Sequence, residues 1–512
     1  MVFAGALLFL AFSFFRTSNL PWVEEDNYYG AIYAQAAHNN LRAGITETGG
    51  VPVTLYFGPL PLPREEYYVH HPTLMPLMVT ASVALLGESE RAVRLVPISC
   101  SLLSLLFLWL LLRDTAGRRA AALTAVFFAT MPMELHYGDM VDFEPCEVMW
   151  MLASLLCLRR WHLSGLVRWA LLAGLCCMGA VCTDWPGYLF VLGVSISFLM
   201  KNRKRQRLFA LSLLGGASLS GMSFLLQIRK VNPDAWTDLT TAIMMRLGNG
   251  VSTGSSASAQ SHALHFTFQE WCGSVLHGLG QDYLLISWVP VVAGLVFLLR
   301  RMKSDPGYRW LAKALLLMAM AGVPYMLLLR NWSYIHDFAS FFALGAIAIA
   351  GGLGLECLAF GLEGKLFGRR AQPLVAFVLL GLLVWLGQAG FSRAEKQRSQ
   401  FCMLDGSNSE PYTLIPDTGR YLARTFSGHT TILCNFDPYG STLPYYAQRS
   451  IVNNLVSADD WKSANDCTAR PVGGIIWLSA PRASDILATI PETEITRHKI
   501  DGLPFAIWKP AE

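Results

Sequence analysis

The sequence contains little charge. Only 15% of its 512 residues are Asp, Glu, Lys or Arg, whereas 53% are hydrophobic. A soluble globular protein carries about 25% charged residues, so this composition argues against a soluble protein. Apolar runs of roughly 20 residues, the length that crosses a bilayer, recur along the chain. The sequence therefore predicts a polytopic membrane protein.

Several enzyme motifs are also missing. The sequence has no P-loop, no G-x-G-x-x-G run after a strand and no nucleophile elbow, so nucleotide-driven chemistry is not indicated. Its 11 cysteines include no C-x-x-C pair and no Cys/His zinc spacing. Cys402, Cys434 and Cys467 lie in the polar C-terminal part, where one disulfide would leave a third thiol over.

Basic segments set the expected topology. Lys and Arg gather in five short connections, which the positive-inside rule assigns to the cytoplasm: 113–119, 159–169, 201–207, 300–313 and 363–370. About 11 spanning helices follow, at 2–20, 92–112, 119–137, 146–160, 165–182, 186–200, 207–227, 283–300, 311–329, 338–360 and 373–391. The N-terminus is then cytoplasmic and the C-terminus lies outside. This parity leaves residues 72–87 as a re-entrant or interfacial helix on the outer face.

A second interfacial helix is expected at residues 27–43. Tyr29, Tyr33, Ala37 and Leu41 recur every four residues and form its apolar face. The intervening polar residues are expected to turn away from that face: Gln35, His38, Asn39 and Arg42. The first outer loop, 21–91, thus carries two helices at the membrane surface.

The C-terminal part changes in character. Residues 393–512 are polar, with strand-like runs at 430–436 and 473–480 and a helical run at 418–426, which predicts a small extracytoplasmic α/β domain. Residues 1–392 form the membrane module. Within it, the outer loop 229–282 is expected to hold amphipathic helices at 234–246 and 264–280, separated by a flexible stretch at 248–263. The predicted fold class is mainly α, a helical membrane bundle with this small α/β domain.

Ionisable residues are costly near a membrane, and on this topology many of them gather at the outer face. They come from connections that are far apart in the sequence: Glu24, Glu25, Asp26, His70, His71, Arg91, Arg94, Asp139, Asp142, Glu144, Asp184, Arg330 and His336. This pattern is typical of an active site that opens to the outer leaflet.

Three successive stretches resemble a known superfamily. EEDNYYGAIYAQAAHNNLRAG, HHPTLMPLMVTASVALLGESERAVRL and FATMPMELHYGDMVDFEP, followed by TDWPG and the His-Asp-Phe of NWSYIHDF, are similar to landmarks of the GT-C membrane glycosyltransferases. The related families are the dolichyl-phosphate-mannose protein mannosyltransferases and the bacterial lipid A aminoarabinose transferases. The resemblance covers roughly residues 20–350. It departs in having Glu25-Asp26 where the family often has Asp-Glu, and Asp139 where a basic residue is common.

The resemblance implies transfer of a sugar from a polyprenyl phosphate to an acceptor. Such a reaction needs a base for the acceptor proton, and the acidic pair implies Asp26 or Glu25 for this role. The structural alternative is that Asp26 caps the helix that follows, which would contribute only ~1 kcal/mol. Glu144, with Asp142 nearby, is a second catalytic candidate, for acceptor orientation or cation binding, although the run DFEP is also an ordinary helix start.

The departing phosphate needs positive charge or hydrogen-bond donors. The candidates for binding the donor substrate are Arg330, His336, His70, His71, Asp184 and Arg94. Five of them have a structural alternative: Arg330 can snorkel to the headgroups, the paired histidines can cap a helix, Asp184 can form a turn and Arg94 can begin a helix. No cofactor is certain. A divalent cation is the candidate cofactor, with Asp139, Asp142 and Glu144 as its candidate ligands.

The expected partners are a polyprenyl-phosphate-linked sugar, a glycan, lipid or protein acceptor, and the lipid bilayer, with no nucleic acid. The expected location is the cytoplasmic, or inner, membrane. A transporter is the alternative from another class, but the chain lacks paired broken helices in matched halves. A non-catalytic membrane scaffold is the third interpretation, and it predicts that removing the carboxylates affects no transfer reaction.

Overall fold

The structure is a computed structural model of the 512-residue chain. It describes residues 2–22, 28–201, 203–247, 266–361, 372–399, 411–428, 430–435, 442–452, 455–468, 472–478, 480, 482–500 and 503–510. Helices dominate these residues, which confirms the mainly α fold with a small C-terminal α/β region. The chain divides into two compact units: residues 1–18, 69–75 and 95–397 form the first, and residues 19–68, 76–94 and 398–512 form the second.

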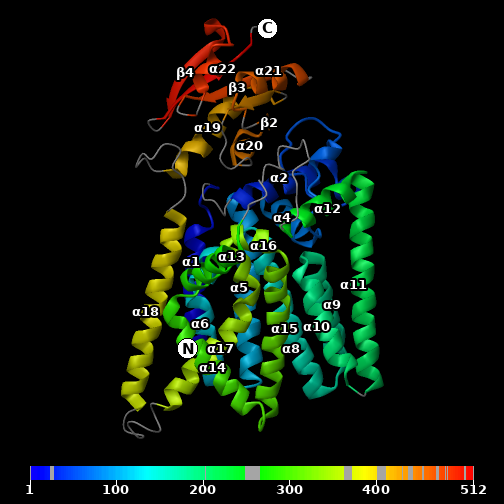
Figure 1. The fold of residues 1–512 in the computed structure, drawn as a ribbon, viewed down its shortest axis with the longest axis vertical. Coiled ribbons are helices and arrows are strands. Elements are labelled where there is room, and N and C mark those ends of the chain that lie inside the picture. Colours follow the sequence, from blue (N-terminus) through cyan, green and yellow to red (C-terminus); the bar gives the residue numbers. More distant parts are fainter. Residues whose placement is uncertain are drawn as a thin grey trace. The chain divides into compact units, whose positions relative to one another are not determined.

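The first unit is built from long helices that run alongside one another (Figure 1). Its elements are α1 (Val2–Thr17), α5 (Glu90–Arg113, from Leu95 on), α6 (Arg118–Thr130), α7 (Pro132–Tyr137), α8 (Phe143–Ser164), α9 (Val167–Thr183), α10 (Pro186–Leu199), α11 (Lys204–Val231), α12 (Ala235–Arg246), α13 (Phe268–Asp282), η3 (Leu285–Ser287), α14 (Trp288–Arg301), α15 (Pro306–Leu328), α16 (Arg330–Ile335), η4 (Asp337–Ala343), α17 (Leu344–Gly361) and α18 (Gln372–Ser399). Each expected span therefore coincides with a helix or a pair of consecutive helices.

Not every one of these helices is long enough to cross a bilayer by itself. Among the described residues, four segments pass this test by length and composition: α5, α11, α15 and the continuous η4–α17 segment Asp337–Ala359. The pair Phe268–Asp282 and Leu285–Arg301 would add a fifth span, but it bends by 87°. The chain is a multi-pass membrane protein, and the expected number of 11 spans stays a prediction.

One expected span is broken. The sequence predicts a continuous helix over 119–137, but α6 ends at Thr130 and α7 starts at Pro132. Met131, between them, has extended backbone angles, φ −70° and ψ 133°. Proline disfavours helical geometry in the residue before it and is well tolerated at the start of a helix, so Pro132 explains both the end of α6 and the beginning of α7.

Small residues let α14 and α17 approach closely. A Cβ atom at Gly294 would lie 1.8 Å from the backbone oxygen of Ala350, and one at Gly354 would lie 1.7 Å from that of Pro290. No side chain fits at these distances. Close backbone contact through glycine is a common way to pack helices in membranes, where the hydrophobic effect does not drive them together.

The second unit combines residues 19–68 and 76–94 with the C-terminal residues 398–512. It contains α2 (Tyr28–Ala43), α3 (Ile45–Thr48), η1 (Arg64–Glu66), α4 (Leu74–Leu86, from Pro76 on) and the first turn of α5. The helices expected at 27–43 and 72–87 are confirmed as α2 and α4. The expected faces of α2 are partly wrong, because Leu41 is exposed while Gln35 and Asn39 are fully buried. Asn39 Nδ2 donates to the backbone oxygens of Val53 and Tyr56, so its amide is satisfied inside the unit.

The C-terminal residues form a five-stranded sheet in the order β2-β1-β3-β5-β4. Its strands are β1 (Thr431–Cys434), β2 (Ile451–Val452), β3 (Val472–Trp477), β4 (Ile495–Ile500) and β5 (Leu503–Trp508). β1 is parallel to β2 and β3, whereas β5 is antiparallel to β3 and β4. Its helices are α19 (Pro411–Thr425), α20 (Thr442–Ala447), α21 (Ala458–Cys467), α22 (Ala483–Leu487) and the short η7 (Glu492–Glu494) (Figure 1).

Successive residues of the central strands alternate between two cores. Ile475 and Trp477 of β3 pack with Leu422 and Leu443, from α19 and α20, on one face. Ile476 packs on the other face, in a core that α21 and α22 also line. A strand places alternate side chains on opposite faces, so a sheet with helices on both faces buries both sides of its central strand, here from Gly473 to Trp477.

Candidate active site

A buried histidine lies at the centre of the polar residues in the first unit. His71 Nδ1 lies 2.6 Å from Asp184 Oδ1, and its Nε2 lies 3.2 Å from Arg246 Nη2. The ring also stacks on Phe143, with centroids 4.5 Å apart and planes 17° apart. These residues come from the chain before α4, the end of α9, the end of α12 and the start of α8. The structure thus brings together residues from four connections.

The partners of His71 determine where its proton sits. A guanidinium only donates hydrogen bonds, so the lone pair of His71 Nε2 must accept from Arg246. The ring proton is then on Nδ1, which donates to the carboxylate of Asp184. Burial lowers the pKa of His71, in opposition to Asp184, which raises it. Both observations describe a neutral imidazole in a single tautomer, hydrogen-bonded on both sides.

Backbone contacts hold this arrangement in place. The indole nitrogen of Trp185, directly after Asp184, donates to the backbone oxygen of His70 at 2.8 Å. Asn331 Nδ2, in α16, donates to the backbone oxygen of Met245 at 3.2 Å, which fixes the end of α12 where Arg246 lies. Asp184 is 2% exposed, so its bond to His71 is well shielded from water.

Two further histidines are neutral near the same guanidinium. Burial, with Arg246 and His71 as additional causes, lowers the pKa of His70 to about 3. Burial and Arg246 lower the pKa of His336, which follows α16, to about 4. A positive charge disfavours protonation of a neighbouring imidazole, so these shifts indicate that Arg246 acts on both rings. Arg246 is therefore the shared positive charge of His70, His71 and His336.

Carboxyl groups line the start of α8. Glu144 is 3% exposed and Glu147 is fully buried. Glu147 interacts electrostatically with Asp184 and Glu144, so the three carboxyl groups are neighbours. Tyr325, in α15, is also within electrostatic range of Arg246 and of these carboxyl groups. We call His70, His71, Glu144, Glu147, Asp184, Arg246, Tyr325 and His336 the outer cluster.

Other predicted residues have different surroundings. Arg330 is exposed at the start of α16, and within the described chain its side chain has no hydrogen bond or ion pair. Arg94 is 1% exposed and belongs to the second unit. Its guanidinium donates to the backbone oxygen of Leu20 and lies 4.0 Å from the ring centroid of Trp22. Their roles in donor binding stay predictions.

The candidate metal ligands have other partners. The hydroxyl of Thr17 donates to the carboxylate of Asp139, and Asp142 caps α8 by accepting from the backbone N–H of Phe143 at 2.9 Å. In the part of the chain that the structure describes, no group of three or more His, Cys, Asp or Glu side chains is arranged to hold a metal ion. We derive no chemical step through a metal.

The predicted bases, Glu25 and Asp26, lie outside the described residues, as does the stretch 248–263. Conversely, the structure adds residues that the sequence did not single out. Arg246 ends a helix that was expected for its amphipathic pattern, but its partner His71 is 175 residues away, so no local pattern marks it. Glu147 did carry a signal, because it is an ionisable residue within an expected span, 146–160.

Known proteins resemble this chain in part of its sequence and in its fold. The sequence model of the dolichyl-phosphate-mannose-protein mannosyltransferase family matches residues 70–227, which include His70, His71, Glu144 and Asp184. No curated protein matches the sequence.

Solved structures match over most of the chain. ArnT from Cupriavidus metallidurans in the apo state is 13% identical with a TM-score of 0.66, over 99% of this chain and 96% of that chain. The same protein bound to undecaprenyl phosphate gives a TM-score of 0.62 at 13% identity, over 99% of this chain and 97% of that one. The archaeal oligosaccharyltransferase AglB from Archaeoglobus fulgidus, in complex with an inhibitory peptide and a dolichol-phosphate, is 16% identical with a TM-score of 0.56, over 93% and 69%. The chain has the fold of the GT-C glycosyltransferases, which confirms the resemblance found in its sequence.

Proposed function

We propose that the protein is a membrane glycosyltransferase that moves a sugar from a polyprenyl phosphate to an acceptor of the cell envelope. The observation that carries the proposal is the outer cluster. Within a GT-C fold, it gathers a half-buried guanidinium, three neutral imidazoles and three carboxyl groups at the ends of membrane helices. Structures of this fold with bound undecaprenyl phosphate and dolichol-phosphate support the class of donor.

In the proposed reaction, an acceptor oxygen or nitrogen attacks the anomeric carbon of the sugar from the side opposite the phosphate. The bond between that carbon and the phosphate oxygen breaks, and its electron pair leaves with the polyprenyl phosphate. A carboxylate takes the acceptor proton, which is the role we propose for Asp26 or Glu25. The anomeric configuration is therefore inverted.

Arg246 suits the stabilisation of the leaving phosphate. A guanidinium presents several N–H donors in a plane that matches phosphate oxygens. One of its nitrogens is held by His71, whose opposite side is held by Asp184, so the guanidinium is oriented before a substrate arrives. Preorganised donors aimed at developing negative charge are among the largest contributions to catalysis. We propose His70, His336 and Arg330 as further donor contacts, and Glu144 as the residue that orients the acceptor.

The proposal includes a location and an acceptor class. The Lys and Arg segments 113–119, 159–169, 201–207 and 300–313 would face the cytoplasm of an inner membrane. The helix ends opposite these segments would then face outside. So would the outer cluster and the C-terminal residues. Acceptors on that side are lipid A or lipopolysaccharide, another envelope glycan or a protein.

A deletion strain tests the function. We expect glycan and lipid profiling to show a sugar that is lost in the deletion and restored by the wild-type chain. Asp26→Asn and Arg246→Ala, at equal membrane abundance, should not restore it. Arg229→Ala, an exposed cation at the end of α11, serves as the matched control and should restore it.

The same experiment separates the two carboxylates and the competing classes. Full restoration by both Asp26→Asn and Glu25→Gln would remove the acidic pair from the reaction. A profile that is unchanged in the deletion would contradict a transferase and favour a scaffold or a transporter.

A further inference from the structure

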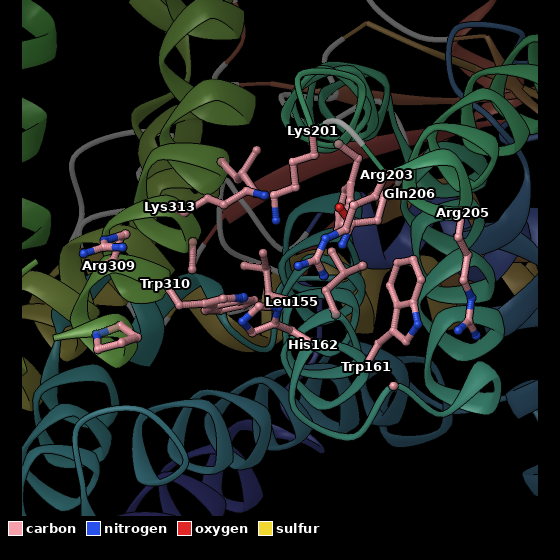
Figure 2. A pocket seen from close by; sticks show the side chains of 16 residues that line it. Leu155, Trp161, His162, Lys201, Arg203, Arg205, Gln206, Arg309, Trp310 and Lys313 are labelled. Atoms are coloured by element: carbon pink, nitrogen blue, oxygen red, sulfur yellow. The ribbon is translucent and has the colours of Figure 1, made fainter.

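A cavity of about 480 Å³ lies in the first unit, and Figure 2 shows the side chains that line it. It is enclosed by the last turns of α8, the connection from α10 to α11 and the first turns of α15. The outer cluster draws on the opposite ends of these helices, since Phe143 starts α8 and Tyr325 lies near the end of α15. From Phe143 to Trp161 an α-helix rises by ~27 Å, close to the thickness of the hydrocarbon core. The cavity and the outer cluster thus lie at opposite membrane faces.

Cations line one part of this cavity. Lys201, Arg203, Arg205, Arg309 and Lys313 contribute to its wall, together with His162, and among the described residues the lining includes no Asp or Glu. Figure 2 shows Lys201 and Arg203, from the connection between α10 and α11, and Lys313, from α15, extending toward the cavity. Like charges repel, so an anion placed among these cations would lower their mutual repulsion.

Two of the ammonium groups share one aromatic ring. Lys201 Nζ lies 5.2 Å and Lys313 Nζ 4.6 Å from the ring centroid of Phe198. Burial and the charge of Arg203 lower the pKa of Lys201. An anion between these cations would relieve their mutual repulsion.

The rest of the lining is apolar. Leu155, Leu158 and Leu317 form part of the wall, with the rings of Trp161 and Trp310 beside them. A soluble phosphate would use only the cations, whereas an amphiphile would use both parts of the lining. Basic pockets between membrane helices are known to take the headgroups of anionic lipids.

We propose that this cavity binds an anionic phospholipid of the leaflet opposite the outer cluster, with the lipid phosphate between Lys201, Arg203 and Lys313 and an acyl chain against Leu155, Leu158 and Leu317. The inference is independent of the transfer reaction, because none of these residues belongs to the outer cluster. It assigns a lipid site to the face that the positive-inside rule places in the cytoplasm.

The test uses the full-length protein, purified in detergent and stripped of lipid. Native mass spectrometry counts the lipid molecules retained after titration with phosphatidylglycerol or, separately, phosphatidylcholine. We expect wild type to retain phosphatidylglycerol preferentially and millimolar inorganic phosphate not to displace it. Lys201→Gln/Lys313→Gln should weaken this retention about 30-fold, since each cation near an anionic headgroup contributes on the order of a fivefold change in affinity.

Two controls keep the result interpretable. Lys201→Arg/Lys313→Arg retains both charges and should retain the lipid, which shows that the loss in the Gln variant is not a loss of folding. Lys204→Gln removes an exposed cation of α11 that does not line the cavity, and it should behave as wild type. Equal retention by the Gln double variant and by Lys204→Gln would overturn the site. Equal retention of phosphatidylcholine, or displacement by inorganic phosphate, would overturn its assignment to an anionic lipid.

Discussion

At the scale of single residues, Arg246 explains most of the outer cluster. Its guanidinium donates to His71 and, after burial, is the next cause of the lowered pKa of His70 and His336, so one charge acts on three histidines from two distant parts of the sequence. The sequence indicated the histidines and Asp184 but not Arg246, because the contact that makes Arg246 important is formed only by folding.

The first prediction concerns donor binding. Arg246→Ala should weaken binding of a polyprenyl phosphate about 10- to 100-fold, the usual cost of a lost charged hydrogen bond. Arg246→Lys should recover only part of it, because an ammonium lacks the planar set of donors. Affinity for the polyprenyl phosphate, measured on purified protein, is the readout, with Arg229→Ala as control. Wild-type affinity in Arg246→Ala would contradict our assignment of the phosphate site.

The same affinity measurement distinguishes two roles for Arg330. Its exposed side chain is compatible with two roles: contact with lipid headgroups, and contact with the donor substrate. Reduced affinity in Arg330→Ala supports the donor contact, and unchanged affinity supports snorkelling.

The second prediction is a pH dependence of stability. His336 is neutral in the folded protein down to about pH 4, whereas an unfolded histidine titrates near 6.5. Between these values the unfolded chain binds more protons, so the free energy of unfolding falls as the pH is lowered through this window. The melting temperature in detergent should therefore be lower at about pH 5 than at about pH 7.5.

Substitution isolates this contribution. Gln cannot take up a proton, so the melting temperature of His336→Gln should fall less than that of wild type over the same pH interval. His277→Gln, at an exposed histidine of α13, should keep the wild-type dependence. Identical pH dependence in His336→Gln and wild type would refute the neutral imidazole at His336.

At the scale of elements, the sequence predicted helices better than their faces. Long apolar runs located the spans, and Pro132 marks the break between α6 and α7. Periodicity failed for α2, because Asn39 is buried to bind loop carbonyls, a contact that depends on residues more than ten positions away. The β4–β5 hairpin was also missed, since β4 is a polar, largely exposed edge strand with no apolar run.

The third prediction concerns the pairing of α14 and α17. Gly354→Ala would place a methyl group on the backbone of Pro290, so the two helices must move apart. We expect a lower melting temperature, since overpacking costs about 1–3 kcal/mol and exceeds the gain of about 1 kcal/mol from replacing a helical glycine by alanine.

Gly215→Ala is the matched control, because a Cβ at this position of α11 meets nothing within 4 Å. It should leave the melting temperature unchanged or raise it slightly. Equal melting temperatures for the two variants would show that the close approach of α14 and α17 does not contribute to stability.

At the scale of the whole molecule, the placement of Lys and Arg predicts the orientation of the chain across the membrane. The helices alone do not determine this orientation. A phosphatase reporter, active only outside the cytoplasm, should be active when fused to the C-terminus and inactive when fused after Lys303. The opposite pattern would invert the topology and move the outer cluster to the cytoplasmic face. A reporter that is active at both positions would contradict the parity of the spans.

A C-terminal residue of the second unit contacts the chain just before the acidic residues of the first loop. The phenol oxygen of Tyr446 accepts from the backbone N–H of Trp22 at 2.9 Å, and its hydroxyl donates to Glu90 at 2.8 Å. Trp22 is the residue two positions before Glu24. The anchor of the proposed base thus comes from a helix 424 residues further along the chain. Chimeras that exchange the C-terminal part between proteins of this fold would therefore alter the chain next to the proposed base, and a protease cut that removes this part should abolish the proposed transfer even though the membrane helices are intact.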